Sequence, residues 1–225
     1  MTAFLLALTV FLAAHMVPSM PPVRRALVAR LGERGYLAVY AGGSTVLLVW
    51  LIVEALRAPY VHVWTAPAWV YAIPAVVMPG AFVLLCAGLL TPNPLSVSLS
   101  RAPFDPARPG VAGLARHPVL WGFGLWSLSH MPANGSAVLV ILFGVFTAFS
   151  FGGMGLVDAK RKRTMGKATW AWLDAARRAG RGAGLAAWPT VAGTALGLGL
   201  YALFLFWAHT AWIGVSPLPL WPAFW

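Results

Sequence analysis

Three histidines lie in or beside apolar stretches of the sequence, where an ionisable side chain is costly and therefore indicates a functional role. His15 comes late in the first apolar run, and His117 and His130 open and close the fourth. The single cysteine, Cys86, leaves these histidines without the thiolates of a typical structural zinc site. Two imidazoles from different helices suit the axial positions of a haem iron, which needs one or two ligands and an apolar slot.

The spacing of the histidines limits which of them can share one iron. His117 and His130 are thirteen residues apart, which on a helix corresponds to a rotation of about 220°, so one pocket would not use both. At a rise of about 1.5 Å per residue, the depths of His15 and His130 in the membrane differ by roughly 9 Å. His117 would lie about as close in depth to His15, on the inner side. Geometry therefore leaves His15 paired with either His130 or His117.

The elements that position these histidines are predicted to be membrane helices. Of the 225 residues, 60% are hydrophobic and 9% are charged, whereas soluble domains have about 25% charged residues. Such a chain cannot cover a water-facing surface, and its length is better counted in spans of about 20 apolar residues. In this setting the net charge of +11 favours retention of basic loops beside an anionic cytoplasmic leaflet over binding to nucleic acid.

Six apolar runs predict an all-α polytopic membrane protein with about six transmembrane helices. The predicted spans are residues 2–18, 36–56, 68–90, 118–131, 137–157 and 190–213. We expect one transmembrane domain over residues 1–225, with a cytoplasmic basic segment at about 158–189. Aromatic residues interleave with basic ones at 160–181, which indicates a basic helix lying on the inner leaflet. Gly193 and Gly197 form a pair that permits close helix packing.

The basic residues set the predicted orientation in the membrane. If six spans alternate, the loops after the first, third and fifth spans hold fifteen of the sixteen Lys and Arg residues, and only Arg57 falls on the other side. This asymmetry predicts that those loops are cytoplasmic and that the N- and C-termini lie on the outer, periplasmic side of the inner membrane. Tryptophans predicted near the outer boundary are Trp64, Trp69, Trp207, Trp212, Trp221 and Trp225.

Several motifs in this chain resemble those of the NnrU family. The signature-like motif runs from Arg116 to Gly122 and continues with Leu125-Trp126, His130 and Asn134-Gly135. Further matching residues are His15 to Ser19, Arg24, Leu31-Gly32-Glu33, Tyr36, Gly155 to Asp158, Gly166 and Trp170. The resemblance covers nearly the whole chain.

The resemblance implies a haem b site. The family includes plant and cyanobacterial 15-cis-zeta-carotene isomerases, described as membrane proteins with haem b. By that resemblance His15 and His130 would be the axial ligands of the haem iron, and His117 is the alternative ligand. The pocket would be completed by Ser127, Trp126, Arg116 and Asn134. The plant form has a cysteine at the position of Ser127, so a ligand exchange that uses sulfur is not expected here.

Two functions follow from the resemblance. Bacterial members are associated with nitrite and nitric oxide reduction in denitrifiers, which implies an accessory or sensor protein. The alternative is an enzyme, a cis–trans isomerase of a carotenoid-like polyene, because a lipid-soluble substrate would reach an intramembrane haem directly. The expected partners are membrane lipids and a polyene or nitric oxide ligand, and no nucleic acid.

Two further interpretations have less support in the sequence. Membrane methyltransferases that use S-adenosylmethionine carry a similar Arg-His-Pro-x-Tyr-x-Gly element and need an acidic pair on a later helix. Here Leu120 replaces the tyrosine, and only the separate Asp158 and Asp174 follow. A structural membrane scaffold is the interpretation that would apply if the protein bound no cofactor.

The charge asymmetry makes the orientation testable. A topology reporter inserted near Lys162 should read as cytoplasmic, and one fused after Trp225 should read as periplasmic, because basic loops are retained inside. Alkaline phosphatase and green fluorescent protein fusions measure this directly. The opposite pattern would show that the predicted orientation is wrong.

Overall fold

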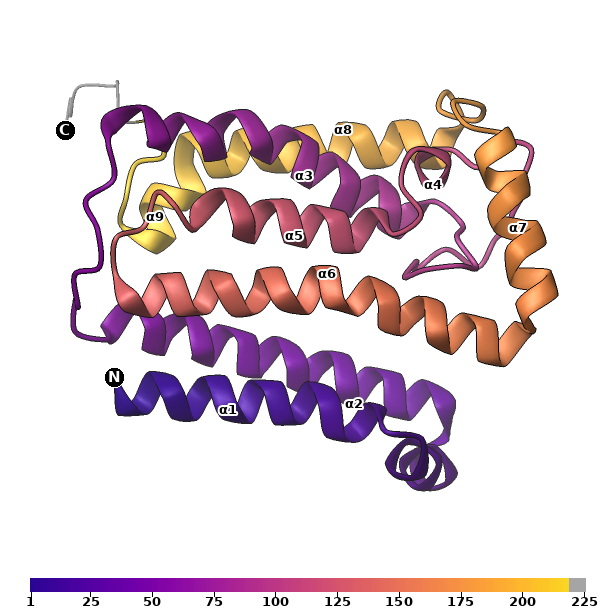
Figure 1. Ribbon diagram of the computed structural model, residues 1–225, viewed down its shortest axis with the longest axis horizontal. Helices are drawn as coiled ribbons and strands as arrows, with labels where there is room; N and C mark the ends of the chain where they lie inside the picture. Colours follow the sequence, from indigo (N-terminus) through magenta and orange to yellow (C-terminus); the bar gives the residue numbers. More distant parts are fainter. Residues whose placement is uncertain (219–225) are drawn as a thin grey trace. The chain divides into compact units, whose positions relative to one another are not determined.

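The computed structural model describes residues 1–218 and consists of helices joined by turns and loops over that range (Figure 1). Five helices are long and apolar enough to cross a membrane. They are Thr2–Ser19, Pro21–Arg57, Ala68–Leu90, Ala137–Met165 and Trp188–Ile213. The prediction of an all-α polytopic membrane protein is therefore confirmed. Trp221 and Trp225, and with them the end at which the second reporter is fused, lie outside the described residues.

The remaining predicted span is helix α5, Pro118–His130, which has 13 residues. At 1.5 Å per residue it is about 20 Å long, shorter than the ~30 Å hydrocarbon core. It lies alongside α3, Ala72–Leu90 (Figure 1). The total of six spans and the outer position of the termini remain predictions.

Contacts divide the chain into two compact units. Unit 1 comprises residues 1–63 and 136–142, and unit 2 comprises residues 64–135 and those from 143 onward. The boundary falls within α6, Ala137–Met165, whose first residues group with unit 1. His15 therefore belongs to unit 1, whereas His117 and His130 belong to unit 2.

Unit 1 is built on two packed helices. Helix α1, Thr2–Met16, is followed by the 3₁₀ turn η1, Val17–Ser19, and packs against α2, Pro21–Arg57. Its buried side chains recur every three or four residues along one stripe, as expected for a helix that packs on one side. They are Phe4, Ala7, Leu8 and Phe11.

The basic segment after the first span, predicted as a loop, is helical. Pro21 and Pro22 occupy the first positions of α2, where their fixed φ angle is compatible with a helix and the missing N–H costs no hydrogen bond. The helix is interrupted at Gly32, whose φ of 69° and ψ of 165° suit only glycine. Hydropathy missed this helix because arginines lower the hydropathy of a segment without opposing helix formation.

Unit 2 is organised around α3, which follows the 3₁₀ turn η2, Ala68–Tyr71. It packs against α5 and against α8, Trp188–Leu203 (Figure 1). The approach of α8 to α3 depends on small residues, as the glycine pair predicted. A Cβ atom added to Gly193 would lie 2.4 Å from the Cα of Ala87, and one added to Gly197 would lie 2.7 Å from the carbonyl oxygen of Phe82.

The other helices of unit 2 are short or extend further than predicted. Helix α4, Val111–Leu114, precedes α5, and α7, Lys167–Ala179, follows α6. After α8 come the π-helical segment η3, Phe204–Ala208, and α9, His209–Ile213. The fifth span was predicted to end at 157, but α6 continues to Met165. Its last turn carries Lys162 and Arg163, cations that favour a helix C-terminus.

The contact between α3 and α8 predicts different costs at two glycines of one helix. Gly193→Ala should lower the free energy of unfolding by about 1–3 kcal/mol, because the added methyl group would overlap the α3 backbone. Gly199→Ala is the matched control, since nothing lies within 4 Å of its added Cβ. Thermal unfolding of the two purified variants in the same detergent measures the difference. Equal midpoints would show that α8 does not approach α3 this closely.

Candidate functional site

Helix α5 separates the predicted site residues of unit 2 into two groups. His117 precedes its first residue and His130 is its last, so the two are about 20 Å apart along the helix axis. Arg116 lies with His117, whereas Trp126, Ser127 and Asn134 lie near His130. We call the first group, around Arg116, the basic end of unit 2, and the second the His130 end.

At the His130 end, the imidazole is oriented by its own helix. His130 Nδ1 lies 2.8 Å from the carbonyl oxygen of Trp126, and a carbonyl can only accept, so Nδ1–H donates. In the neutral ring the lone pair is then on Nε2. The ring also lies among aromatic side chains, with its centroid 6.2 Å from the Trp126 ring and 5.4 Å from the Phe143 ring. The His130 ring therefore lies in apolar surroundings, and its Nε2 atom carries a lone pair.

The polar neighbours of His130 stabilise the helix and the turn that follows it. Ser127 is buried, its hydroxyl donates to the carbonyl of Phe123 at 3.0 Å, and it accepts from Thr147 at 2.9 Å. Asn134 Nδ2 donates to the carbonyl of His130 at 2.7 Å. The hydroxyl and amide therefore serve backbone and side-chain partners within unit 2.

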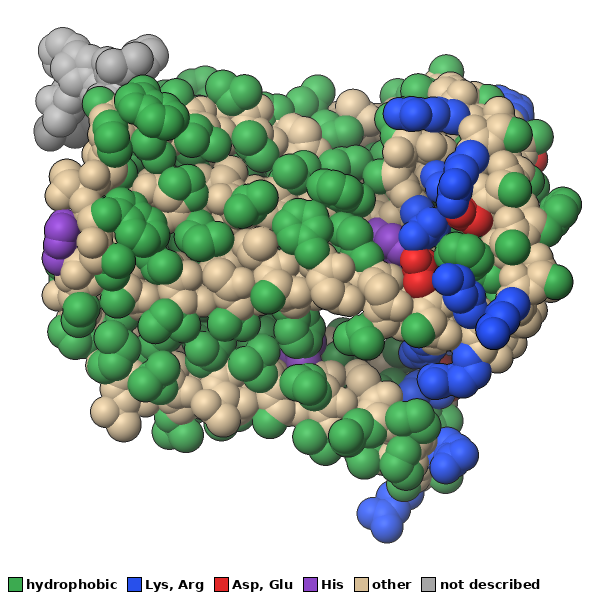
Figure 2. Space-filling view, in the orientation of Figure 1, with side chains coloured by type: hydrophobic (Ala, Val, Ile, Leu, Met, Phe, Trp, Pro, Cys, Tyr) green, Lys and Arg blue, Asp and Glu red, His purple; other side chains and the backbone are tan. Residues whose placement is uncertain are grey.

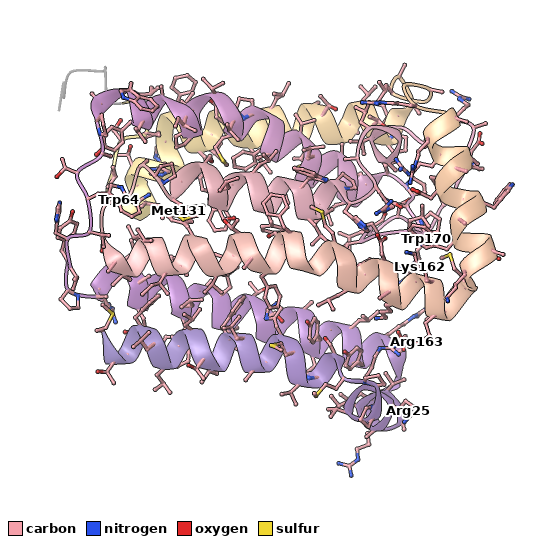
Figure 3. All side chains as sticks on the ribbon, viewed as in Figure 1. Arg25, Trp64, Met131, Lys162, Arg163 and Trp170 are labelled. Carbon is pink, nitrogen blue, oxygen red and sulfur yellow. The ribbon has the colours of Figure 1, made fainter. Side chains whose placement is uncertain are left out.

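The turn after α5 is also fixed from the start of unit 2. Trp64 Nε1–H donates to the carbonyl of Pro132 at 3.0 Å, and Figure 3 shows the Trp64 side chain close to Met131. This bond satisfies a carbonyl that follows the end of the helix, where no intrahelical donor is available. The end of α5, and with it His130, is therefore held at a defined position.

In unit 1, His15 has the same local arrangement. It lies in the last turn of α1, and its Nδ1 is 3.2 Å from the carbonyl oxygen of Phe11. Nδ1–H therefore donates to that oxygen, and Nε2 carries the lone pair. The Phe11 ring centroid lies 4.3 Å away and the Tyr40 ring centroid 5.8 Å away. His15 and His130 thus share a tautomer and an aromatic setting.

At the basic end, Arg116 joins three helices of unit 2. Its guanidinium lies 2.6 Å from Asp158 Oδ2 on α6 and 3.3 Å from both carboxylate oxygens of Asp174 on α7. Arg116 itself comes just before α5. Its guanidinium also lies over the ring of Trp170, 5.1 Å from the centroid. The cation thereby connects the start of α5 with the last turns of α6 and with α7.

His117 has both ring nitrogens engaged. Nδ1 lies 2.8 Å from Ser96 Oγ, and Nε2 lies 3.1 Å from Asp158 Oδ1 and 3.2 Å from Arg116 Nε. Nε2 bonds Asp158 when it donates and Arg116 when it accepts, so the two contacts are alternatives. Burial lowers the pKa of His117 in spite of the Asp158 charge. At neutral pH the ring is therefore a neutral part of this hydrogen-bonded cluster.

Asp174 attaches α7 to the rest of unit 2. It accepts from Arg177 at 2.8 Å and from Arg178, and Arg177 also donates to the carbonyl of Ala112 on α4 at 2.8 Å. Burial opposes ionisation of Asp174, but the bonds from Arg177 and Arg178 hold its pKa below the ordinary value. The stability that this carboxylate contributes is therefore present at neutral pH and lost only as the pH falls through the depressed pKa.

Helix α7 thus has charged residues on its buried face as well as on its exposed face. The sequence predicted a basic helix on the inner leaflet, but Asp174 and Arg177 are buried against unit 2. Figure 2 shows Lys and Arg side chains gathered around acidic ones over α7 and the adjoining end of α6. Trp172 on the other side of α7 is exposed and is the residue available to an interface.

Sequence reasoning missed the ion-pair network of the basic end. It assigned Arg116 to a haem pocket and noted Asp158 and Asp174 only as too far apart to form an acidic pair. A usable signal was present, because the chain has only five acidic residues and two of them, Asp158 and Asp174, lie in its most basic segment. The aromatic part of the network is visible in Figure 3, where Lys162 lies next to Trp170, its Nζ 4.1 Å from the ring centroid.

Within the described part of the chain, no group of three or more His, Cys, Asp or Glu residues is placed to hold a metal ion. His15 and His130 each keep one ring nitrogen with a lone pair, on Nε2, and lie in separate units. At the basic end, the charged side chains of Arg116, Asp158 and Asp174 already bond one another and their neighbours.

The network predicts unequal roles for two adjacent arginines that bind the same carboxylate. The Arg177 side chain is 7% exposed and that of Arg178 is 65% exposed. Arg177→Ala should cost about 3–5 kcal/mol, because it leaves Asp174 buried with too little compensation. Arg178→Ala should cost about 1 kcal/mol or less. Thermal unfolding and hydrogen exchange of the α7 amides measure both. Similar exchange in the two variants would contradict the docked position of α7.

Comparison with known proteins agrees with this architecture. The family model described as NnrU protein matches residues 3–217, across both units. The chain therefore belongs to the NnrU family. Comparison with curated proteins and with solved structures gives no match.

Proposed function

We propose that this NnrU-family protein is an integral inner-membrane haem b protein with an accessory or sensor role in nitrite and nitric oxide reduction. The observation that supports haem binding is the shared tautomer of His15 and His130. Histidines that ligate a metal through one nitrogen commonly donate the other N–H to a carbonyl or carboxylate, which fixes the ring. Both residues have this arrangement, each with a carbonyl four residues earlier as the acceptor.

His117 is a poor ligand by the same criterion. Both of its nitrogens are used by Ser96, Asp158 and Arg116, so binding a metal would break a buried cluster. It also lies at the other end of α5 from His130. Of the two pairings left open by the spacing, we therefore propose His15 with His130 as the axial pair, and the engaged nitrogens of His117 support this choice.

The donor set fits haem better than other cofactors. His15 lies beside Phe11 and Tyr40 in unit 1. His130 lies beside Trp126 and Phe143 in unit 2. Each unit therefore offers a neutral imidazole in aromatic surroundings, which is the type of ligand that haem iron requires. When bound, haem b would supply a redox-active iron, and nitric oxide would bind to it only after one of the two histidines had been released. Ser127 is a neutral hydroxyl committed to its own helix, so this position supplies no third ligand. These properties suit a protein that detects or handles nitric oxide.

Absorption spectra of purified variants test the proposed ligands. His130→Ala should abolish the haem spectrum, because it removes an axial ligand, and His15→Ala should weaken or abolish it. His117→Ala is the matched control on the same helix. It should keep haem bound but unfold at a lower temperature, because Asp158 and Ser96 lose a partner.

The outcomes separate the alternatives. Haem loss in His117→Ala with retention in His130→Ala would contradict the proposed pair. A wild-type protein that folds without haem would favour the scaffold interpretation. Isomerisation of ζ-carotene on co-expression would identify the enzyme alternative, and binding of nitric oxide without isomerisation is expected.

A further inference from the structure

A cavity of about 250 Å³ lies at the basic end of unit 2, away from His130. It lies where two membrane helices end. Thr91 follows the last residue of α3, and Thr190 is in the first turn of α8. Their buried hydroxyl oxygens are 3.4 Å apart and lie among the lining residues. Because both helices are membrane spans, the cavity lies at the level where a bilayer changes from acyl chains to headgroups.

Two connecting segments form the wall of the cavity, and glycines bring them together. Gly110, with φ of 59°, belongs to the connection before α4, and Gly184, with φ of 75°, to the connection before α8. The N–H of Gly110 donates to the carbonyl of Ala183 at 3.1 Å. A Cβ added to Gly110 would lie 2.5 Å from Thr190 Oγ1, so a larger residue would press on the cavity floor. The cavity is therefore a fixed part of the fold.

The cavity carries two opposite charges on a mostly apolar lining. Arg108 and Asp105 both line it, together with Phe104, Pro92 and Pro189. In the part of the chain that the structure describes, Arg108 and Asp105 form no ion pair with each other. Asp105 Oδ1 accepts the backbone N–H of Ala107 at 2.9 Å, which fixes the carboxylate. A ligand with a single negative charge would satisfy Arg108 but would be repelled by Asp105.

We propose that this cavity binds the headgroup of a zwitterionic aminophospholipid such as phosphatidylethanolamine. Its phosphate would pair with Arg108, and its ammonium group would pair with Asp105. The volume is below the ~300–1,000 Å³ of pockets for drug-sized ligands, so it suits a headgroup. The acyl chains have an apolar surface to follow, because Trp188 at the start of α8 is 78% exposed and Val191 is also exposed.

The site is independent of the proposed haem. It involves neither His15 nor His130. A bound lipid at this position would fill the space between the α3–α5 and α7–α8 connections and hold them together. Haem content and lipid retention are therefore separate measurements, and failure of one proposal does not imply failure of the other.

Native mass spectrometry of the delipidated, full-length protein tests the assignment. The probes are phosphatidylethanolamine, phosphatidylglycerol with the same acyl chains, and soluble glycerophosphoethanolamine. We expect phosphatidylethanolamine to be retained best. Arg108→Gln should reduce its retention about two- to fivefold, as expected for loss of an exposed charge pair. Asp105→Asn should reduce it to a similar extent and increase retention of phosphatidylglycerol. Ala102→Phe should fill the cavity and reduce retention of both lipids.

Arg101→Gln is the matched control, because Arg101 is an exposed cation of the same connection that does not line the cavity. It should change retention less than twofold. Equal retention of the two lipids, unchanged by Asp105→Asn, would overturn the proposal and indicate attraction of anionic lipid to a basic surface. Displacement of the lipid by an equal concentration of glycerophosphoethanolamine would also overturn it and identify a soluble phosphoester as the ligand.

Discussion

A partly buried guanidinium must be neutralised where α5 begins, and the arrangement of the basic end depends on this requirement. Arg116 meets it with Asp158 of α6 and Asp174 of α7. Ion pairs of this kind contribute little net stability compared with apolar packing, but removing one partner is costly. Their main effect here is geometric. The three helices pack so that Arg116 lies against both carboxylates, and that arrangement also orients His117 and places α7.

The same constraint extends along α5 to its other end. Because a helix is stiff, fixing the position of Arg116 and His117 also fixes the direction in which α5 leaves the basic end. The hydrogen bond from Trp64 to Pro132 then holds the far end. His130 is thus positioned by contacts at both ends of a 13-residue helix. The position of a side chain can therefore be defined by the helix that carries it, without rigid surroundings of its own.

Much of the fold could be predicted from hydropathy because hydropathy reports which segments prefer lipid to water. The span at 68–90 agrees with the structure at both ends, where Pro67 and Thr91 interrupt the apolar run. The helix at 21–31 and the last turns of α6 were missed for the same reason, since they are helical but polar.

The partners of Arg116 were missed because they lie 42 and 58 residues away, and such pairings leave no periodic pattern. The spacing also left His117 and His130 as alternative ligands, and their different hydrogen-bond partners, on which the proposed choice of His130 rests, could not be read from the sequence.

These sequence separations have a consequence for the way in which the chain is made. During synthesis Arg116 precedes Asp158 by 42 residues and Asp174 by 58. At about 5–20 residues per second, its carboxylate partners follow roughly 2–12 s later. In that interval Arg116 is an unpaired cation beside a newly inserted hydrophobic segment, which is the signal that retains a loop on the cytoplasmic side. In the predicted orientation, one side chain would therefore act first as a topology signal for the translocation machinery and then, once α6 and α7 have been made, as the ion-pair centre of the folded protein.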